Sequence, residues 1–332
     1  MTLPTFDFSP SYLSLFKSGE LAERAKKLTQ LLASCDLCPR LCRVNRLKDE
    51  RGVCRSGALA AVVSCCIHHG EEPAVSGSRG SGTIFFANCS MRCEFCQNYQ
   101  ISQDPESWYG NEISAANLAK EMLSLQKQGC HNINLVTPTH YVPQIVQAVN
   151  IAAGEGLVLP LVYNTSGYDN KATIEALDGV VDIFMPDLKY ASDEHASRYS
   201  HAPDYVRNAH AAIKEMQRQV GQLEVDFEGI AMRGLIIRHL ILPGDIAETE
   251  ATLMWLAQEV SSQTTVSIMS QYHPCNRATN FPVLNRLISI AEYQRALLAL
   301  EHSGLQNGWM QDLESSEHYL PDFERFNRPF DD

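Results

Sequence analysis

Apolar and polar positions alternate in blocks along most of this chain. From Thr83 onward, short runs that are almost entirely apolar are separated by longer segments in which apolar residues recur every three or four positions. The short runs have the length and composition of strands, and the longer segments have helical periodicity. The predicted strands are 83–87, 133–137, 159–163, 181–186, 234–242 and 265–270.

The predicted helices carry recognisable start and stop residues. Ser114 is a suitable N-cap for a helix that stops at Gly129, and Pro143 suits the first turn of the next helix. Upstream, residues 10–34 show an approximate helical stripe, and residues 60–67 form a small β-like patch. Further helices are predicted near 171–177, 204–220, 248–260 and 286–302.

This alternation predicts an α/β protein with a parallel sheet covered by helices. Six strand–helix units are too few for a closed eight-stranded barrel. We therefore expect a partial (β/α)6 barrel, open on one side, with a doubly wound open sheet as the alternative. The expected organisation is an N-terminal helical and cysteine-rich extension (1–80), the partial barrel (81–280), and a C-terminal helix and tail closing the barrel (281–332).

Composition narrows the possible partners and compartment. The net charge of −12 argues against a nucleic-acid-binding surface, which needs clustered Lys and Arg. No apolar run approaches the roughly 20 residues of a spanning helix, and the first 16 residues do not match a signal peptide. Eleven cysteines without an export signal indicate metal and redox chemistry in a reducing compartment. We expect a cytoplasmic protein that binds neither nucleic acid nor membrane.

Three of these cysteines follow the first predicted strand directly. Cys89, Cys93 and Cys96 have C-x3-C-x2-C spacing, which lets three thiolates hold three corners of a [4Fe–4S] cluster. The fourth iron then has no protein ligand and can bind a small molecule. Ligands gather at the carboxyl ends of strands in parallel barrels, which favours a functional loop here. The alternatives are a zinc site completed by a distant residue and three thiols that are merely neighbours.

A second cysteine group precedes the barrel. Cys35, Cys38, Cys42 and Cys54 form a plausible site of four thiolates with no open position. Thiolates suit both structural zinc and an auxiliary [4Fe–4S] cluster, so ligand type does not choose between them. Free or buried thiols are the remaining alternative.

The C-x3-C-x2-C segment resembles the signature of the radical S-adenosylmethionine (SAM) superfamily. In addition, CEFCQNYQIS, NLVTPTHYVP, YNTSGYD, MPDLKY, RHLILPG and MSQYHP resemble, in this order, the PflX-type relatives of the pyruvate formate-lyase activating enzymes. The resemblance runs from the N-terminal cysteines to about residue 320, although activating enzymes often begin near the cluster loop. It implies a partial barrel, a [4Fe–4S] cluster and SAM.

The resemblance also implies a reaction. One-electron reduction of SAM would give methionine and a 5′-deoxyadenosyl radical, which abstracts a hydrogen atom from a substrate. In the activating enzymes that atom is the α-hydrogen of a glycine on a glycyl radical enzyme. Radical modification of a small molecule or of another peptide residue is the alternative, and a non-catalytic, zinc-stabilised scaffold is the second alternative. A flavodoxin or ferredoxin is the implied electron donor.

The strand ends would then carry the contacts to SAM. Lys189 would pair with its carboxylate, Asp187 would orient Lys189, Arg238 suits a bidentate carboxylate contact, and Phe95 could stack on adenine. Short polar groups at the same ends complete the expected cofactor-binding set: Thr137, Thr139, Asn164 and Ser166.

A few other residues have two interpretations. His140 and His239 could touch substrate or cofactor or pack as strand-end groups, and Cys275 could donate a hydrogen atom or be structural. The His68–Glu72 segment is expected to be a solvated turn, with a wall of the substrate mouth or a metal site as the alternatives. Core thiols are expected at Cys65, Cys66 and Cys130.

Overall fold

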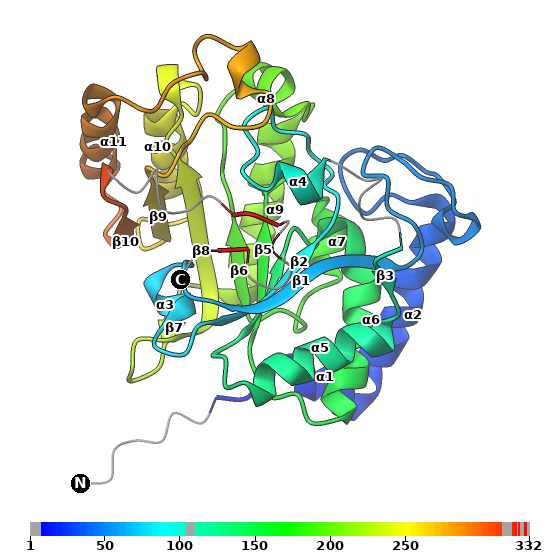
Figure 1. The fold of residues 1–332 in the computed structure, drawn as a ribbon. Coiled ribbons are helices and arrows are strands. Elements are labelled where there is room, and N and C mark those ends of the chain that lie inside the picture. Colours follow the sequence, from blue (N-terminus) through cyan, green and yellow to red (C-terminus); the bar gives the residue numbers. More distant parts are fainter. Residues whose placement is uncertain (1–7, 104–109, 314–320, 324, 326–328, 331–332) are drawn as a thin grey trace, which may run out of the picture.

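The computed structural model describes residues 8–103, 110–313, 321–323, 325 and 329–330. Its centre is one twisted, mostly parallel sheet (Figure 1). All six predicted strands are present, with ends shifted by a few residues. The parallel strands are β2 (Ser81–Phe86), β4 (Ile133–Val136), β5 (Leu161–Thr165), β6 (Ile183–Pro186), β8 (Ala231–Leu240), β9 (Thr265–Met269) and β10 (Asn307–Met310).

Strand order decides between the two expected architectures. The sheet runs β10-β9-β8-β6-β5-β4-β2, so each parallel strand lies beside its neighbour in sequence and the order never reverses. A doubly wound sheet requires a reversal, because it places helices on both faces. Successive right-handed crossovers in one direction place the helices on one face instead. The fold is therefore an α/β partial-barrel arrangement, and the doubly wound alternative is wrong.

The sheet extends beyond the six predicted strands at both edges. The β-like patch becomes β1 (Ala60–His68), which pairs antiparallel with β2, and β3 (Glu112–Ile113) pairs with β1. The β1 strand thus lies in the sequence range assigned to the extension but belongs to the sheet. At the other edge, β10 was not predicted, because its sequence NGWM carries little strand signal. A two-residue strand, β7 (Glu224–Val225), pairs antiparallel with β8.

The helices confirm most of the predicted segments. Ser114 caps α5 by accepting a hydrogen bond from the Asn117 amide at 3.2 Å, and Pro143 lies in the first turn of α6. One helix, α8, was not predicted. The helices that cover the sheet are α5 (Ala115–Lys127), α6 (Val142–Gly154), α7 (Lys171–Glu175), α8 (Asp193–Ser200), α9 (Tyr205–Val220), α10 (Thr249–Glu259) and α11 (Ile290–Ser303), and α3 (Pro73–Ser76) and α4 (Tyr99–Ser102) are single turns.

The predicted helix over 10–34 is wrong as one element. Gly19 adopts φ +80°, which L-residues other than glycine rarely take, and it separates α1 (Tyr12–Ser18) from α2 (Glu20–Leu31). A short 3-10 turn, Leu32–Ser34, follows and leads into the first cysteine. The remaining 3-10 turns are Arg46–Lys48, Thr139–Tyr141, Pro243–Asp245 and Ala278–Asn280.

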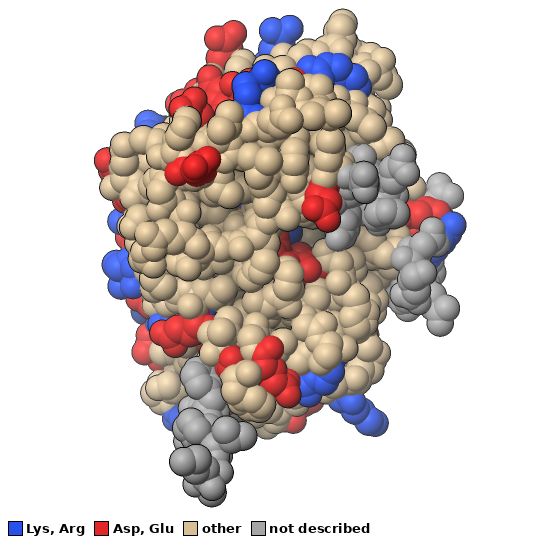
Figure 2. All heavy atoms as spheres, turned by 90° about the vertical axis from the view of Figure 1, so that its left-hand side faces the viewer, with Lys and Arg blue, Asp and Glu red and all other residues tan. Residues whose placement is uncertain are grey.

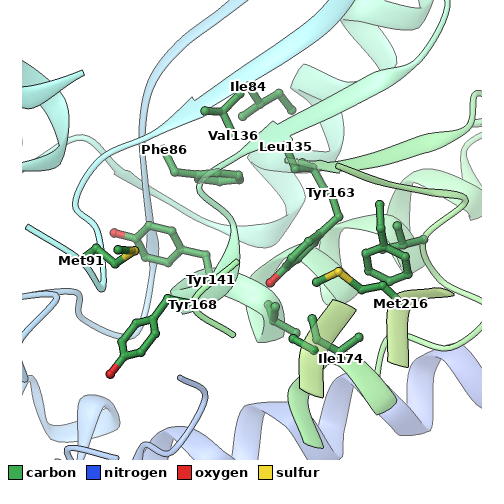
Figure 3. Close-up of a cluster of buried hydrophobic side chains, with 14 of the residues drawn as sticks. Ile84, Phe86, Met91, Leu135, Val136, Tyr141, Tyr163, Tyr168, Ile174 and Met216 are labelled. Atoms are coloured by element: carbon green, nitrogen blue, oxygen red, sulfur yellow. The ribbon is translucent and has the colours of Figure 1, made fainter. Parts of the chain in front are cut away.

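The core lies between the sheet and its covering helices. In Figure 3, side chains of β2, β4 and β5 face Ile174 of α7 and Met216 of α9. Met91 and Tyr141, from loops after β2 and β4, lie side by side at the edge of this cluster. The core therefore continues under the loops at the carboxyl ends of the strands, which fixes the site described below. No helix in the described part of the chain is both long and apolar enough to cross a bilayer.

Candidate active site at the carboxyl ends of the strands

The loop that carries Cys89, Cys93 and Cys96 begins where β2 ends. Backbone hydrogen bonds hold it to neighbouring segments: the Glu94 amide donates to the Tyr199 carbonyl at 2.8 Å, and the Arg277 amide donates to the Glu94 carbonyl at 2.9 Å. The loop is therefore a fixed part of the molecule.

The three thiols lie in one electrostatic environment. Burial raises the pKa of all three, and that of Cys93 rises to about 11 although the Lys189 ammonium opposes the shift. Each thiol of this group also feels another member of the group or Lys189. The thiolate is the metal ligand, so a metal bound here would displace the three thiol protons. This donor set fits an iron–sulfur cluster.

A cavity of about 760 Å³ lies against this loop. Cys93, Cys96 and Phe95 line it together with Asn164, Asp187, Lys189 and Arg238 from the ends of β5, β6 and β8. The face in Figure 2 is hollowed near its centre, and acidic atoms are visible in the hollow. The sequence prediction that these residues share one site is therefore supported by their common cavity, while their contacts to a cofactor remain predictions.

A charged network spans the cavity wall. Lys189 Nζ lies 2.6 Å from Asp187 Oδ2, and Arg238 Nε lies 2.9 Å from Asp187 Oδ1. Arg238 also donates to Asn164 Oδ1 at 2.6 Å. Burial alone would raise the pKa of Asp187, but the Arg238 and Lys189 cations lower it overall. Asp187 thus fixes the directions of two cations, as expected for Lys189.

Sequence reasoning missed the acidic residues of this network. The expectation of a solvated turn at 68–72 is wrong, because the loop after β1 folds into the cavity. Glu71 accepts hydrogen bonds from Asn134 at 2.9 Å and from Arg238 at 3.3 Å. Burial raises the pKa of Glu71 and Glu72, and Glu72 Oε2 has no hydrogen-bond partner. The sequence did contain a signal for this network: two adjacent acidic residues, Glu71 and Glu72, in a chain whose strand ends carry the cations Lys189 and Arg238.

Some expected contact residues do not line the cavity. The Thr139 hydroxyl donates to Asp169 Oδ1 at 2.8 Å, in a buried network that also includes Thr165 and Tyr163. Thr137 adopts φ +59° and its amide donates to the Asn164 carbonyl. The Ser166 carbonyl accepts a hydrogen bond from the Tyr205 hydroxyl at 3.0 Å. None of these three expected residues is part of the cavity wall.

The two histidines and Cys275 also point elsewhere. His239 is fully buried between the Leu188 carbonyl and the Thr249 hydroxyl. The Cys275 thiol donates to the Phe95 carbonyl at 3.6 Å and is not in the cavity wall. These residues support the loops rather than face the space where a ligand would bind.

Phe95 packs from the cluster loop toward Tyr272. The two ring centroids are 5.9 Å apart, and both rings line the cavity. An aromatic surface is therefore present beside Cys93 and Cys96. The stacking role expected for Phe95 requires such a surface and stays a prediction.

The four N-terminal cysteines meet around a second, much smaller cavity of about 10 Å³. Cys35, Cys38, Cys42 and Cys54 all line it, and burial followed by the neighbouring thiols raises the pKa of Cys38. His140 also lines this cavity: its Nε2 lies 3.1 Å from the Ala87 carbonyl, and its Nδ1 has no partner. The expected knuckle therefore brings together residues that are up to 19 positions apart.

The loop of this second group is fastened to the carboxyl edge of the sheet. Asn170 donates to the Asp36 carbonyl at 2.9 Å, and Thr173 donates to the Leu37 carbonyl at 2.8 Å. Arg40 Nε donates to the carbonyl of Ser90, inside the first cysteine loop, at 2.9 Å. The two cysteine loops are therefore direct neighbours.

In neither cysteine group are the side chains arranged as ligands of a single metal ion. Among the described residues, no three His, Cys, Asp or Glu side chains are gathered closely enough to hold one metal ion as they stand. The assignment of metals to these residues thus rests on the shared cavities and the donor chemistry.

Residues 83–233, somewhat less than half of the chain, match the model of the radical SAM superfamily. This range begins with β2 and includes the cluster loop and the ends of β4, β5 and β6. Proteins of that superfamily use a [4Fe–4S] cluster and SAM. This agrees with the donor set around Cys89, Cys93 and Cys96.

The uncharacterized protein MJ0674 of Methanocaldococcus jannaschii is 28% identical over 310 residues, which cover 90% of this chain and 83% of that protein. Two structures of HydG, a maturase of the [FeFe]-hydrogenase, are similar with TM-scores of 0.45 and 0.46, the second from Carboxydothermus hydrogenoformans. Their identities are 10% and 13% over 88% and 90% of this chain. The chain spans only 56% and 64% of those maturases. None of these matches identifies the PflX-type branch.

Proposed function

We propose that Cys89, Cys93 and Cys96 hold the [4Fe–4S] cluster of the radical SAM domain, and that the adjoining cavity takes SAM together with the reacting part of a substrate. The observation that carries this is the meeting of the cysteine loop with Asp187, Lys189 and Arg238 at one cavity of about 760 Å³. When bound, the cluster and SAM supply one-electron cleavage of SAM and hydrogen-atom abstraction.

The residues of the chain orient and enclose this chemistry. Lys189 and Arg238 offer cations of fixed direction to the SAM carboxylate, because Asp187 bridges them. Phe95 and Tyr272 add aromatic surface to the cavity wall beside Cys93 and Cys96. Glu71 and Glu72 bring carboxyl groups to the same cavity, which suits an amine.

The experiment is anaerobic purification and reconstitution with iron and sulfide, followed by incubation with SAM and dithionite. We expect broad visible absorbance and the formation of 5′-deoxyadenosine and methionine. A colourless protein that forms neither product would instead support the zinc-stabilised scaffold.

For the substrate, we propose a glycine residue of a partner protein, on the strength of the sequence segments that resemble the activating enzymes. The test is electron paramagnetic resonance of a candidate glycyl radical enzyme after incubation with the reduced protein and SAM. A glycyl signal is expected. If no glycyl radical enzyme yields one while 5′-deoxyadenosine still forms, the substrate is a small molecule or another peptide residue.

We propose in addition that Cys35, Cys38, Cys42 and Cys54 form a second metal site, either zinc or a second cluster. Support comes from Arg46, which is 1% exposed. Its guanidinium donates to the carbonyls of Gly57 and His140 and lies 3.8 Å from Cys35 Sγ, and no carboxylate of the described residues pairs with it. A buried cation without an anion is costly, and four thiolates on a divalent ion supply two negative charges.

The measurement for this second site is metal analysis of the anaerobic protein. Zinc near one equivalent would identify a structural zinc site. About eight irons, of which about four remain in a variant lacking the first cluster, would identify a second cluster. Protein with neither metal would show that these thiols are unligated.

A further inference from the structure

An arginine-lined hollow lies beside the first cysteine loop. This cavity of about 580 Å³ is lined by Arg40, Arg55, Arg92 and Arg277, with Glu94 and His201. The chain as a whole carries a net charge of −12, so four guanidinium groups at one opening run against its overall charge. We call this cavity the arginine hollow.

The arginine hollow and the SAM cavity lie on opposite sides of the same stretch of backbone. Arg92 and Glu94 line the hollow, whereas Cys93 and Phe95 line the SAM cavity. Residues 94–95 form a turn closed by the Cys96 amide, which donates to the Cys93 carbonyl at 3.2 Å. The backbone of one short segment is thus the partition between the hollow and the thiols.

The positive charge of the hollow is only partly compensated. Glu94 is its one lining carboxylate, and it is shared between Arg277 at 2.7 Å and His201 at 2.5 Å. Arg92 donates to the Val53 carbonyl at 3.4 Å, and Arg40 Nη2 is buried with no hydrogen-bond partner. Within the described residues, no carboxylate therefore forms an ion pair with Arg40, Arg55 or Arg92, whereas Arg277 is paired with Glu94.

We propose that the arginine hollow is the docking surface for a small acidic electron-transfer protein that reduces the cluster. This inference rests on the proposed function, which requires one electron. The carrier in the partner loses one electron and the cluster gains it, with no bond made or broken in this step. The SAM cavity is on the other side of the loop, so an electron donor at the hollow does not compete with SAM or substrate.

The distribution of the guanidinium groups over three segments favours a protein over a small anion as the ligand. These groups come from three separate segments: the four-cysteine loop, the cluster loop and the segment after β9. Positive groups spread over an open surface steer an acidic partner and set its orientation. Since Arg40 also holds the Ser90 carbonyl, a partner bound here contacts the frame of the cluster loop directly.

Charge reversal at Arg55 tests the proposal. Arg55 is exposed, and no hydrogen bond or ion pair is seen for its side chain in the described structure, so Arg55→Glu should leave the fold intact. Arg55→Lys keeps the charge, and Arg207→Glu reverses an exposed arginine on α9 that does not line the hollow. The probe is a reduced flavodoxin, titrated against the reconstituted full chain by calorimetry at low and high salt, with its reoxidation followed by stopped flow.

We expect Arg55→Glu to raise the Kd for flavodoxin about tenfold at low salt, with a smaller effect at high salt. Arg55→Lys and Arg207→Glu should bind like the unaltered protein. Equal binding by Arg55→Glu and Arg207→Glu would overturn the proposal. Inorganic phosphate that binds the hollow tightly and is lost in Arg55→Glu, without any effect on flavodoxin, would assign a small-anion site and also overturn it.

Dithionite separates this inference from the proposed function. Because dithionite is a small reductant that needs no docking surface, Arg55→Glu should form 5′-deoxyadenosine with dithionite at the unaltered rate. If the unaltered protein forms none with dithionite, the proposed function fails, while the calorimetric comparison still reports on the hollow. If Arg55→Glu loses dithionite-driven activity too, Arg55 acts on the site itself and the docking proposal fails.

Discussion

The two cysteine loops are neighbours on one edge of the sheet, yet their surroundings differ. Cys93 and Cys96 border a cavity of about 760 Å³ whose walls carry Asp187, Lys189 and Arg238. The four N-terminal cysteines enclose about 10 Å³ among apolar residues and two buried polar side chains, Arg46 and His140. A three-cysteine loop that borders a large polar cavity through Cys93 and Cys96 leaves room for a ligand that is not protein. Four thiols around a small cavity leave none, which suits a structural or electron-relay role.

The largest effect is expected from a substitution in the first cysteine loop. Cys93→Ala should abolish SAM cleavage, because a cluster that lacks one of three ligands is lost or misplaced. The matched control is Cys130→Ala, which removes a buried thiol that lines neither cavity. Product analysis by chromatography and iron analysis check both variants. Cleavage retained by Cys93→Ala would refute the cluster assignment.

The reciprocal change is Cys38→Ala in the second loop. We expect loss of the second metal and a lower melting temperature, because metal binding contributes directly to folding. The iron held by the first loop should remain, because Cys89, Cys93 and Cys96 are unchanged. Metal analysis and thermal unfolding are the measurements. Metal content equal to that of the unaltered protein would refute the assignment of a second metal site.

A smaller effect is expected from Lys189→Ala, which tests the polar wall that only the first site has. Removing this cation should weaken SAM binding about tenfold or more, as for a buried charge-assisted contact, while the iron content stays unchanged. Equilibrium dialysis with SAM gives the affinity. The exposed Lys171 pairs with Glu175 on α7 and provides the control Lys171→Ala. Unchanged affinity in Lys189→Ala would remove Lys189 from the site.

The smallest functional effect is expected from Thr139→Val. The Thr139 hydroxyl supports buried Asp169, so its removal should cost about 1–3 kcal/mol of unfolding free energy. The Kd for SAM should change less than about twofold, since Thr139 does not line the cavity. Denaturant unfolding and SAM titration measure the two quantities. A large loss of affinity at unchanged stability would return Thr139 to the binding site.

Local pattern in the sequence determined much of this fold. Alternating apolar runs and helical stripes gave all six interior strands and the cap at Ser114, because periodicity and capping act between residues close in the chain. It did not reveal the break at Gly19, which depends on one residue's backbone conformation, or β10, which is held by its pairing with β9. The sequence pattern also did not distinguish the partial barrel from the doubly wound sheet, because the order of strands in a sheet depends on contacts between distant segments.

The same division holds for the site. Cysteine spacing placed Cys89, Cys93 and Cys96 on one loop, and the position of Asp187, Lys189 and Arg238 after strands placed them at one edge. Only the tertiary structure showed that Glu71 enters that site from the antiparallel β1 side, that Thr139 turns away to Asp169, and that Arg46 is buried beside the second thiol group. Spacing encodes neighbours along a chain. Burial, side-chain direction and charge balance depend on what distant segments bring to the same place.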